Sequence, residues 1–159
     1  MKEEKKDKSF LIYIAIIIIF SGACIGAVLF GDAADKSDRH PINVYLFTQS
    51  GCQYGDKQYE YLQELRDDSE IKNYFNIVEY EVWDEYGKKN EDNYLLMHAV
   101  SEKLDVHTAG SPYLVIGDDF SVSGYTDANN HQIKEAILDA TEDENYRDLV
   151  SEMKKSLSN

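Results

Sequence analysis

Cysteine and proline are scarce in this 159-residue chain, and each occurs only twice. Two cysteines cannot build a disulfide framework or a zinc site with four thiolate ligands. Basic residues are also few, with 16 lysines and arginines against 30 aspartates and glutamates, and the net charge is −14. Because nucleic acids and anionic lipid surfaces attract lysine and arginine and repel carboxylates, neither is an expected binding partner.

Charge is absent from residues 10–30, an apolar run that reads FLIYIAIIIIFSGACIGAVLF. A helix with a rise of ~1.5 Å per residue would extend about 31 Å over this run, close to the ~30 Å hydrocarbon core of a bilayer. We therefore expect a single transmembrane helix over residues 10–30. Four lysines in the preceding segment, residues 1–9, favour a cytoplasmic N-terminus and an extracytoplasmic C-terminal domain at the cell membrane.

Two processing alternatives remain open for this run. A cleaved signal peptide has a shorter apolar stretch and an A-x-A-like site, which Asp32-Ala33-Ala34 fits poorly. A lipoprotein signal would end before a cysteine, and Ser21-Gly22-Ala23-Cys24 is a partial match, but apolar sequence continues past Cys24. Because an anchor accounts for the full length of the run, we expect Cys24 to lie within the membrane.

The remainder of the chain is strongly acidic. Residues 1–30 hold four basic and three acidic residues, so 12 basic and 27 acidic residues remain, with a net charge of −15. Residues 31–41 are polar and lack a hydrophobic period, which predicts a linker. Residues 42–159 are numerous enough to bury a core without disulfides.

Hydrophobic periodicity predicts an α/β domain with the element order β-α-β-α-β-β-α. Short β-branched and aromatic runs predict strands at 43–47, 77–83, 113–116 and 120–122. Apolar residues at helical spacing predict helices from residue 52 onward, over 93–104 and from 130 to 138. Residues 142–157 either extend the last of these helices or form another.

The most informative candidate for chemistry is Cys52, which follows a strand and a polar turn at the start of a predicted helix. Unpaired N–H groups and the helix dipole at such a position favour a thiolate, so a cysteine there is a candidate nucleophile. Sixty residues later, Pro112 opens a strand after Gly110-Ser111. Proline is tolerated at the first residue of a strand, and an X-Pro bond in a tight turn can be cis.

With these residues in place, residues 42 to 140 resemble the thioredoxin-like superfamily. The strand 43–47 followed by Cys52-Gln53-Tyr54-Gly55 stands where the family has its first strand and C-x-x-C motif, and the run from Ser111 to Gly117 is similar to its cis-proline loop and third strand. The resemblance implies a thioredoxin-like three-layer sandwich over residues 42–159. It also implies that Cys52 is the nucleophile and that the Ser111–Pro112 backbone pairs with a bound peptide across a groove.

Gly55 departs from the family pattern, because that position carries the resolving cysteine. A mixed disulfide formed by Cys52 would therefore need an outside thiol to break it. The sequence thus predicts a membrane-anchored monothiol protein that exchanges thiols and disulfides with protein substrates. A redox-inactive module that binds an extended protein segment is the alternative, and a Cys52-linked homodimer is a third possibility.

Other chemistry has little support in the sequence. The four histidines show no spacing typical of metal ligands, so we expect neither a metal nor another cofactor. Phosphate-binding, dinucleotide-binding and serine-hydrolase motifs are missing.

Overall fold

The computed structural model describes residues 39–107 and 110–158. The predicted transmembrane helix, the N-terminal segment and the linker up to residue 38 lie outside the described residues. Within the described ranges, no helix combines the length and the apolar character needed to cross a bilayer.

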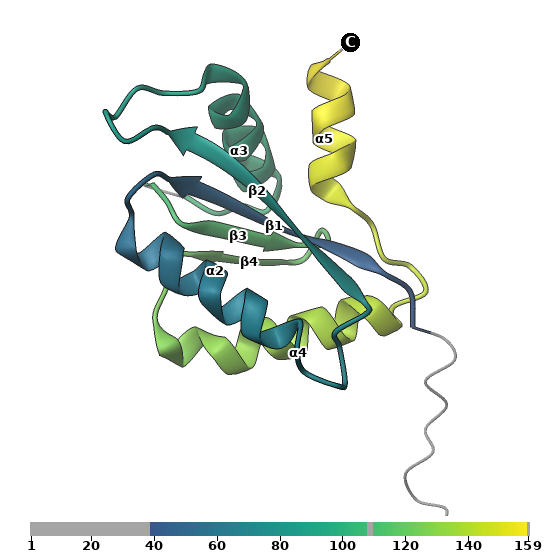
Figure 1. Cartoon of the computed structure of the whole chain (residues 1–159). Coiled ribbons are helices and arrows are strands. Elements are labelled where there is room, and N and C mark those ends of the chain that lie inside the picture. The colour runs from purple at the N-terminus through teal and green to yellow at the C-terminus, as the bar shows by residue number, and fades with distance from the viewer. Residues whose placement is uncertain (1–38, 108–109, 159) are drawn as a thin grey trace, which may run out of the picture. The chain divides into compact units, whose positions relative to one another are not determined.

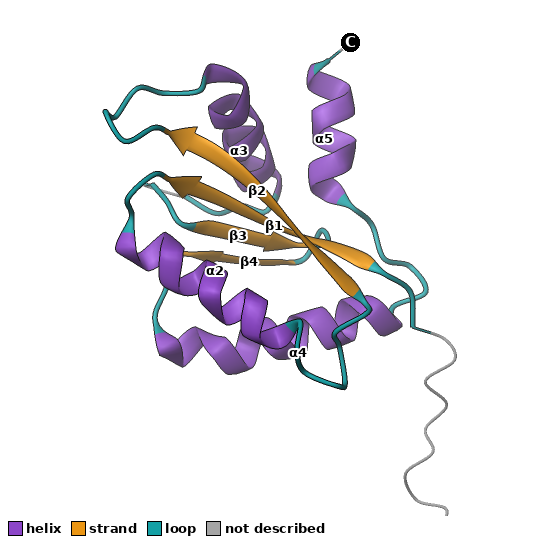
Figure 2. Cartoon of the chain, in the orientation of Figure 1, coloured by secondary structure: helices purple, strands orange, loops and turns teal. Residues whose placement is uncertain are grey.

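The described residues form an α/β domain in which a four-stranded mixed sheet has helices on both faces (Figures 1 and 2). Along the chain, the elements are β1 (Ile42–Gln49), α2 (Gln53–Leu65), β2 (Phe75–Trp83), α3 (Glu91–Lys103), β3 (Tyr113–Ile116), β4 (Phe120–Ser123), the 3₁₀ turn η1 (Asp127–Asn129), α4 (Asn130–Glu142) and α5 (Leu149–Leu157). The predicted α/β class is confirmed, and α5 is a separate helix rather than an extension of α4.

The sheet has the strand order β2-β1-β3-β4. β1 runs parallel to β2 and antiparallel to β3, so the end of β1 lies beside the beginning of β3, where Phe47 is paired with Tyr113. β3 and β4 form a hairpin whose turn begins at Gly117, with φ at +63°, a left-handed conformation that favours glycine. This topology brings the β1–α2 turn close to the residues that precede β3.

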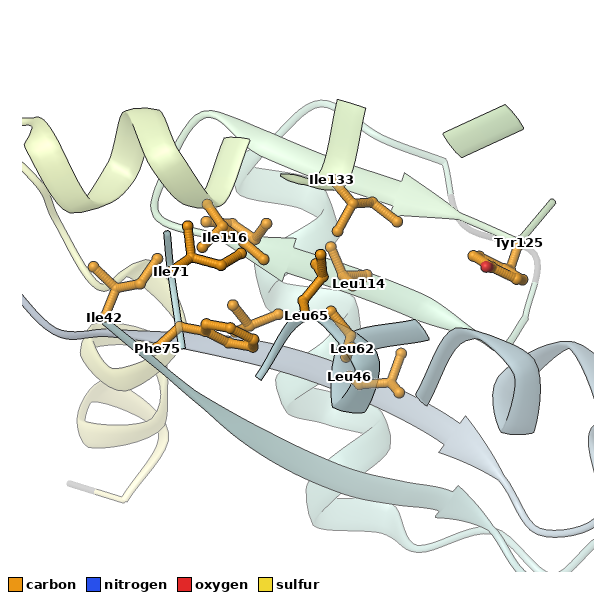
Figure 3. Close-up of a cluster of buried hydrophobic side chains, with 12 residues drawn as sticks. Ile42, Leu46, Leu62, Leu65, Ile71, Phe75, Leu114, Ile116, Tyr125 and Ile133 are labelled. Atoms are coloured by element: carbon orange, nitrogen blue, oxygen red, sulfur yellow. The ribbon is translucent and has the colours of Figure 1, made fainter. Parts of the chain in front are cut away.

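One face of the sheet is covered by α2 and α4. Side chains at alternate positions of the strands point to this face, as expected from the two-residue period of a strand. They pack with the apolar stripe of each helix in a core that Figure 3 shows in close-up. Its buried members are Ile42, Val44, Leu46, Leu62, Leu65, Ile71, Phe75, Leu114, Ile116, Tyr125, Ile133 and Ile137.

The other face is covered by α3 and α5. The intervening strand positions supply this second core, which consists of Tyr45, Phe47, Val82, Leu96, Met97, Val100, Tyr113, Val115, Leu149 and Val150. Burying one such large side chain contributes about 1.5–3 kcal/mol to stability. Leu149 and Val150, the first two residues of α5, therefore stabilise the packing of this helix on the sheet substantially.

Asp148 fixes the start of α5 against β1. One carboxylate oxygen accepts a hydrogen bond of 2.9 Å from the Ser151 backbone N–H, which caps the helix. The other oxygen accepts from the Tyr45 hydroxyl at 2.8 Å and from the Asn43 amide at 3.1 Å. Burial, followed by the hydrogen bond to Asp148, raises the pKa of Tyr45, so this hydroxyl keeps its proton and remains a donor.

Candidate functional site

Cys52 occupies the N-cap of α2, directly after the turn that follows β1. Gly51 in this turn has φ at +73°, and the Cys52 N–H donates to the Gln49 carbonyl at 3.1 Å. The Cys52 side chain makes no capping hydrogen bond and is half-buried. The thiol is therefore held at the beginning of a helix without being used to cap it.

The Ser111–Pro112 peptide bond is cis, and it lies beside Cys52. The Cys52 sulfur is 3.9 Å from the Ser111 carbonyl oxygen, a distance at which a thiol makes a weak donor contact. Pro112 is buried, and its carbonyl accepts a 2.8 Å hydrogen bond from the Gly124 N–H at the end of the hairpin. The structure thus brings together the thiol and the proline loop, which are sixty residues apart in sequence.

Gly55 is buried in the first turn of α2 and faces the end of β1. A Cβ atom placed on Gly55 would lie 3.7 Å from the Cys52 Cβ and 3.6 Å from the Thr48 methyl group. The second distance is ordinary van der Waals contact, so the backbone leaves space for a small side chain at position 55. The site therefore lacks a second thiol because position 55 is glycine, although the backbone there has space for a cysteine side chain.

Three carboxylates lie on one side of the turn that leads to Cys52. A hollow of about 350 Å³ is lined by the turn together with Asp56 of α2 and Glu79 and Glu81 of β2. The Thr48 hydroxyl donates to Glu79 at 3.0 Å, and the Ser50 hydroxyl donates to Glu81. Among the described residues none of the three carboxylates forms an ion pair, so this side of the site is negatively charged.

Sequence reasoning did not single out Glu79 and Glu81 as neighbours of Cys52. Both lie in a run that was predicted as a strand, but their place beside the β1–α2 turn follows from the parallel pairing of β1 with β2. In that register Leu46 is opposite Glu79 and Thr48 is opposite Glu81. The available signal was that Ile77, Glu79 and Glu81 occupy every second position of the strand and therefore share one face of it.

Two buried polar groups near these elements have no hydrogen-bond partner within the described part of the chain. Gln58, on the sheet-facing side of α2, is fully buried, and neither its amide oxygen nor its amide nitrogen is bonded. The Ser111 hydroxyl oxygen is likewise buried and unbonded. An unsatisfied buried polar group costs about 1–3 kcal/mol, so Gln58 is a local source of instability.

The histidines are dispersed over the domain. The His40 ring packs against Tyr146, and His98 lies 3.4 Å from the Glu102 carboxylate on the exposed side of α3. In residues 39–107 and 110–158, no three histidine, cysteine, aspartate or glutamate side chains are placed to share a metal ion.

The site can therefore be described as a single thiol at a helix start, a cis-proline loop beside it and carboxylates on one flank. Comparison of the chain with models of protein families, with curated proteins and with solved structures finds no match.

Proposed function

We propose that this chain is a membrane-anchored thioredoxin-like protein that carries out thiol–disulfide exchange outside the cytoplasm through Cys52. The observation that carries the proposal is the 3.9 Å approach between the Cys52 sulfur and the carbonyl oxygen of the cis Ser111–Pro112 bond. The mixed sheet with two helices on each face is in keeping with that fold. Residues 10–30 would provide the anchor.

The proposed exchange consists of three successive displacements. In the first, the Cys52 thiolate attacks one sulfur of a substrate disulfide, the substrate S–S bond breaks, and its other sulfur leaves as a thiolate. In the second, an external thiolate attacks the Cys52 sulfur of this mixed disulfide and displaces the remaining substrate sulfur. Another external thiol then displaces Cys52, so that two external thiols are oxidised to a disulfide and the substrate takes up two electrons and two protons.

The residues around Cys52 have distinct roles in this reaction. The start of α2 directs the positive end of its dipole at the sulfur. The Ser111 carbonyl oxygen, 3.9 Å from the sulfur, occupies one side of it. The Ser111–Pro112 backbone would lie along a bound peptide. Gly55 supplies no thiol, so the mixed disulfide is broken only from outside the domain.

Turnover of a small disulfide by the full-length protein in detergent tests the proposal. Reduction of hydroxyethyl disulfide by excess cysteamine should be accelerated by the wild-type chain and by Cys24→Ser, and not by Cys52→Ser. Cys24→Ser is the matched control because it removes the only other thiol in the sequence. Equal rates with and without Cys52 would refute the proposal.

The missing thiol at position 55 also favours a second candidate, in which the domain binds an extended protein segment without redox chemistry. In that case a fluorescent peptide substrate analogue without cysteine should bind equally to wild type and Cys52→Ser and more weakly to Pro112→Ala. Binding that is lost with Cys52 alone would contradict this candidate.

A further inference from the structure

Two exposed tyrosines are located at the end of the sheet that holds Cys52. Large hydrophobic side chains that are exposed in the described ranges are few, and they are Tyr54, Tyr59, Tyr86, Leu95 and Leu157. Tyr54 is 61% exposed and belongs to the first turn of α2, two residues after Cys52. Tyr86 is 86% exposed and belongs to the loop between β2 and α3.

The turn that precedes Tyr54 is hydrogen-bonded to the end of β2, which precedes the loop that carries Tyr86. The Ser50 N–H in the β1–α2 turn donates to the Trp83 carbonyl at 2.9 Å, and Tyr86 is three residues beyond Trp83. Figure 1 shows the start of α2 and the β2–α3 loop at the same end of the sheet, where β1 and β2 finish. A bound segment in extended conformation covers ~3.3 Å per residue, so one of three or four residues attached to Cys52 extends about 10–13 Å and passes within reach of Tyr54.

We propose that Tyr54, with Tyr86 at the same end of the sheet, determines the substrate class of Cys52: an extended protein segment with an apolar or aromatic side chain next to its cysteine. This inference rests on the function proposed above. A tyrosine offers a large contact area with only two side-chain torsions to fix, which makes an exposed tyrosine an efficient anchor for a partner. A small disulfide has too little surface to use that area.

The expected effect follows from the size of the ring. Covering most of the exposed part of Tyr54 with an apolar side chain strengthens the bound state by about 5- to 10-fold. Hence the ratio of kcat/KM for an aromatic peptide disulfide to kcat/KM for a small disulfide should fall by about that factor when Tyr54 is truncated.

The experiment uses the full-length protein in detergent with three substrates. Two are ten-residue peptides whose single cysteine is disulfide-bonded to cysteamine, one with Phe and one with Ser next to the cysteine, and the third is hydroxyethyl disulfide. Wild type, Tyr54→Ala, Tyr54→Phe and Tyr54→Ala/Tyr86→Ala are compared. Tyr59→Ala is the matched control, because Tyr59 is also exposed on α2 but lies a further turn from Cys52.

We expect wild type, Tyr54→Phe and Tyr59→Ala to prefer the Phe peptide over the Ser peptide by at least fivefold. Tyr54→Ala should lose most of this preference, and the double variant should lose all of it. The inference is overturned if wild type uses the two peptides equally, or if the preference survives in the double variant. In either case, turnover of hydroxyethyl disulfide by wild type would leave the proposed function standing. If wild type fails to turn over any of the three disulfides, the proposed function itself is wrong and the inference falls with it.

Discussion

Replacing Gly55 with cysteine should create a disulfide with Cys52 in a backbone that already has the required geometry. The Cβ–Cβ separation would be 3.7 Å, and disulfides have Cβ atoms about 3.5–4.5 Å apart. Apart from Cys52 itself, the nearest atom to the new Cβ is a Thr48 methyl carbon at 3.6 Å, which is ordinary contact, so no neighbour has to move. We therefore expect the G55C thiol to pair readily with Cys52.

The size of the effect can be worked out from the ring that the bond closes. For a loop of four residues, the chain-entropy relation gives a loss of about 6 cal/mol/K in the unfolded state, or about 2 kcal/mol of added stability at 25 °C. Urea unfolding of the full-length chain in detergent measures this difference between oxidised and reduced G55C. Trp83 is the only tryptophan and is half-buried beside Tyr94, so its fluorescence follows the described domain.

Two control variants accompany this test. The Cys24→Ser background leaves the two thiols of interest, and Gly55→Ser reproduces the change in helix propensity without a thiol. Mild oxidation should remove both free thiols from G55C and raise its urea midpoint above that of the reduced form. Two thiols that remain alkylatable after oxidation, or an oxidised form that is less stable than the reduced one, would refute the geometry described for α2.

The same variant bears on the proposed reaction. In the wild type, a mixed disulfide between Cys52 and a peptide thiol should persist until an external thiol is added. In G55C the new thiol should attack Cys52 and release the peptide unaided. If the Cys52 disulfide forms in G55C and the peptide stays bound, the geometry holds and the assigned role of position 55 is wrong.

Three further predictions concern stability and are checked by the same unfolding measurement. Gln58→Met should stabilise the domain by about 1–3 kcal/mol, because it removes a fully buried amide without partners and keeps a side chain of similar length; an unchanged or lower urea midpoint would contradict this. Asp148→Ala should destabilise it by about 2–3 kcal/mol through loss of the α5 cap and of the Tyr45 acceptor, and Asp148→Ser should recover the cap part alone. The hydrogen bond from Lys134, followed by that from the Glu70 backbone, lowers the pKa of Asp68, so the contribution of Asp68 to stability is present above about pH 3.9 and is lost as the pH falls through the lowered folded-state pKa. Lys134→Met should therefore reduce the loss of stability at acidic pH, and a loss as steep as in wild type would count against the assignment.

The order of elements could be predicted because each has a clear local signal. β3 is a continuous apolar run bounded by proline and glycine, and α2 has an apolar stripe that includes Leu62 and Leu65. The relation between Cys52 and Pro112 could be predicted only through the resemblance, since the antiparallel pairing of β1 with β3 is what brings them together. Local patterns do not contain that pairing.

Other features depend on tertiary contacts that have no local signal. The spacing of residues 142–157 does not determine the path of the chain after α4, because it fits both an extended helix and a second helix. The structure has a second helix on the opposite face of the sheet, fixed where Asp148 meets Tyr45 and Asn43. Gln58 falls in the apolar stripe of α2, and a periodic pattern that treats it as polar gives no reason to expect it to be fully buried.

If the proposed exchange takes place at Cys52, the surroundings of the sulfur determine how long a partner stays attached. Without a thiol at position 55, a mixed disulfide lasts until an outside thiol reaches the sulfur, and its lifetime is set by access to the site. Carboxylates at Asp56, Glu79 and Glu81 lie on one flank and repel an anionic thiol over about 10 Å at 0.1 M salt. In the proposed complex, contacts of the attached segment with Tyr54 would cover the same end of the sheet. Under the proposed function, this site would retain its partner through a covalent bond and release it when a neutral or cationic thiol arrives, so slow release would follow from the site alone.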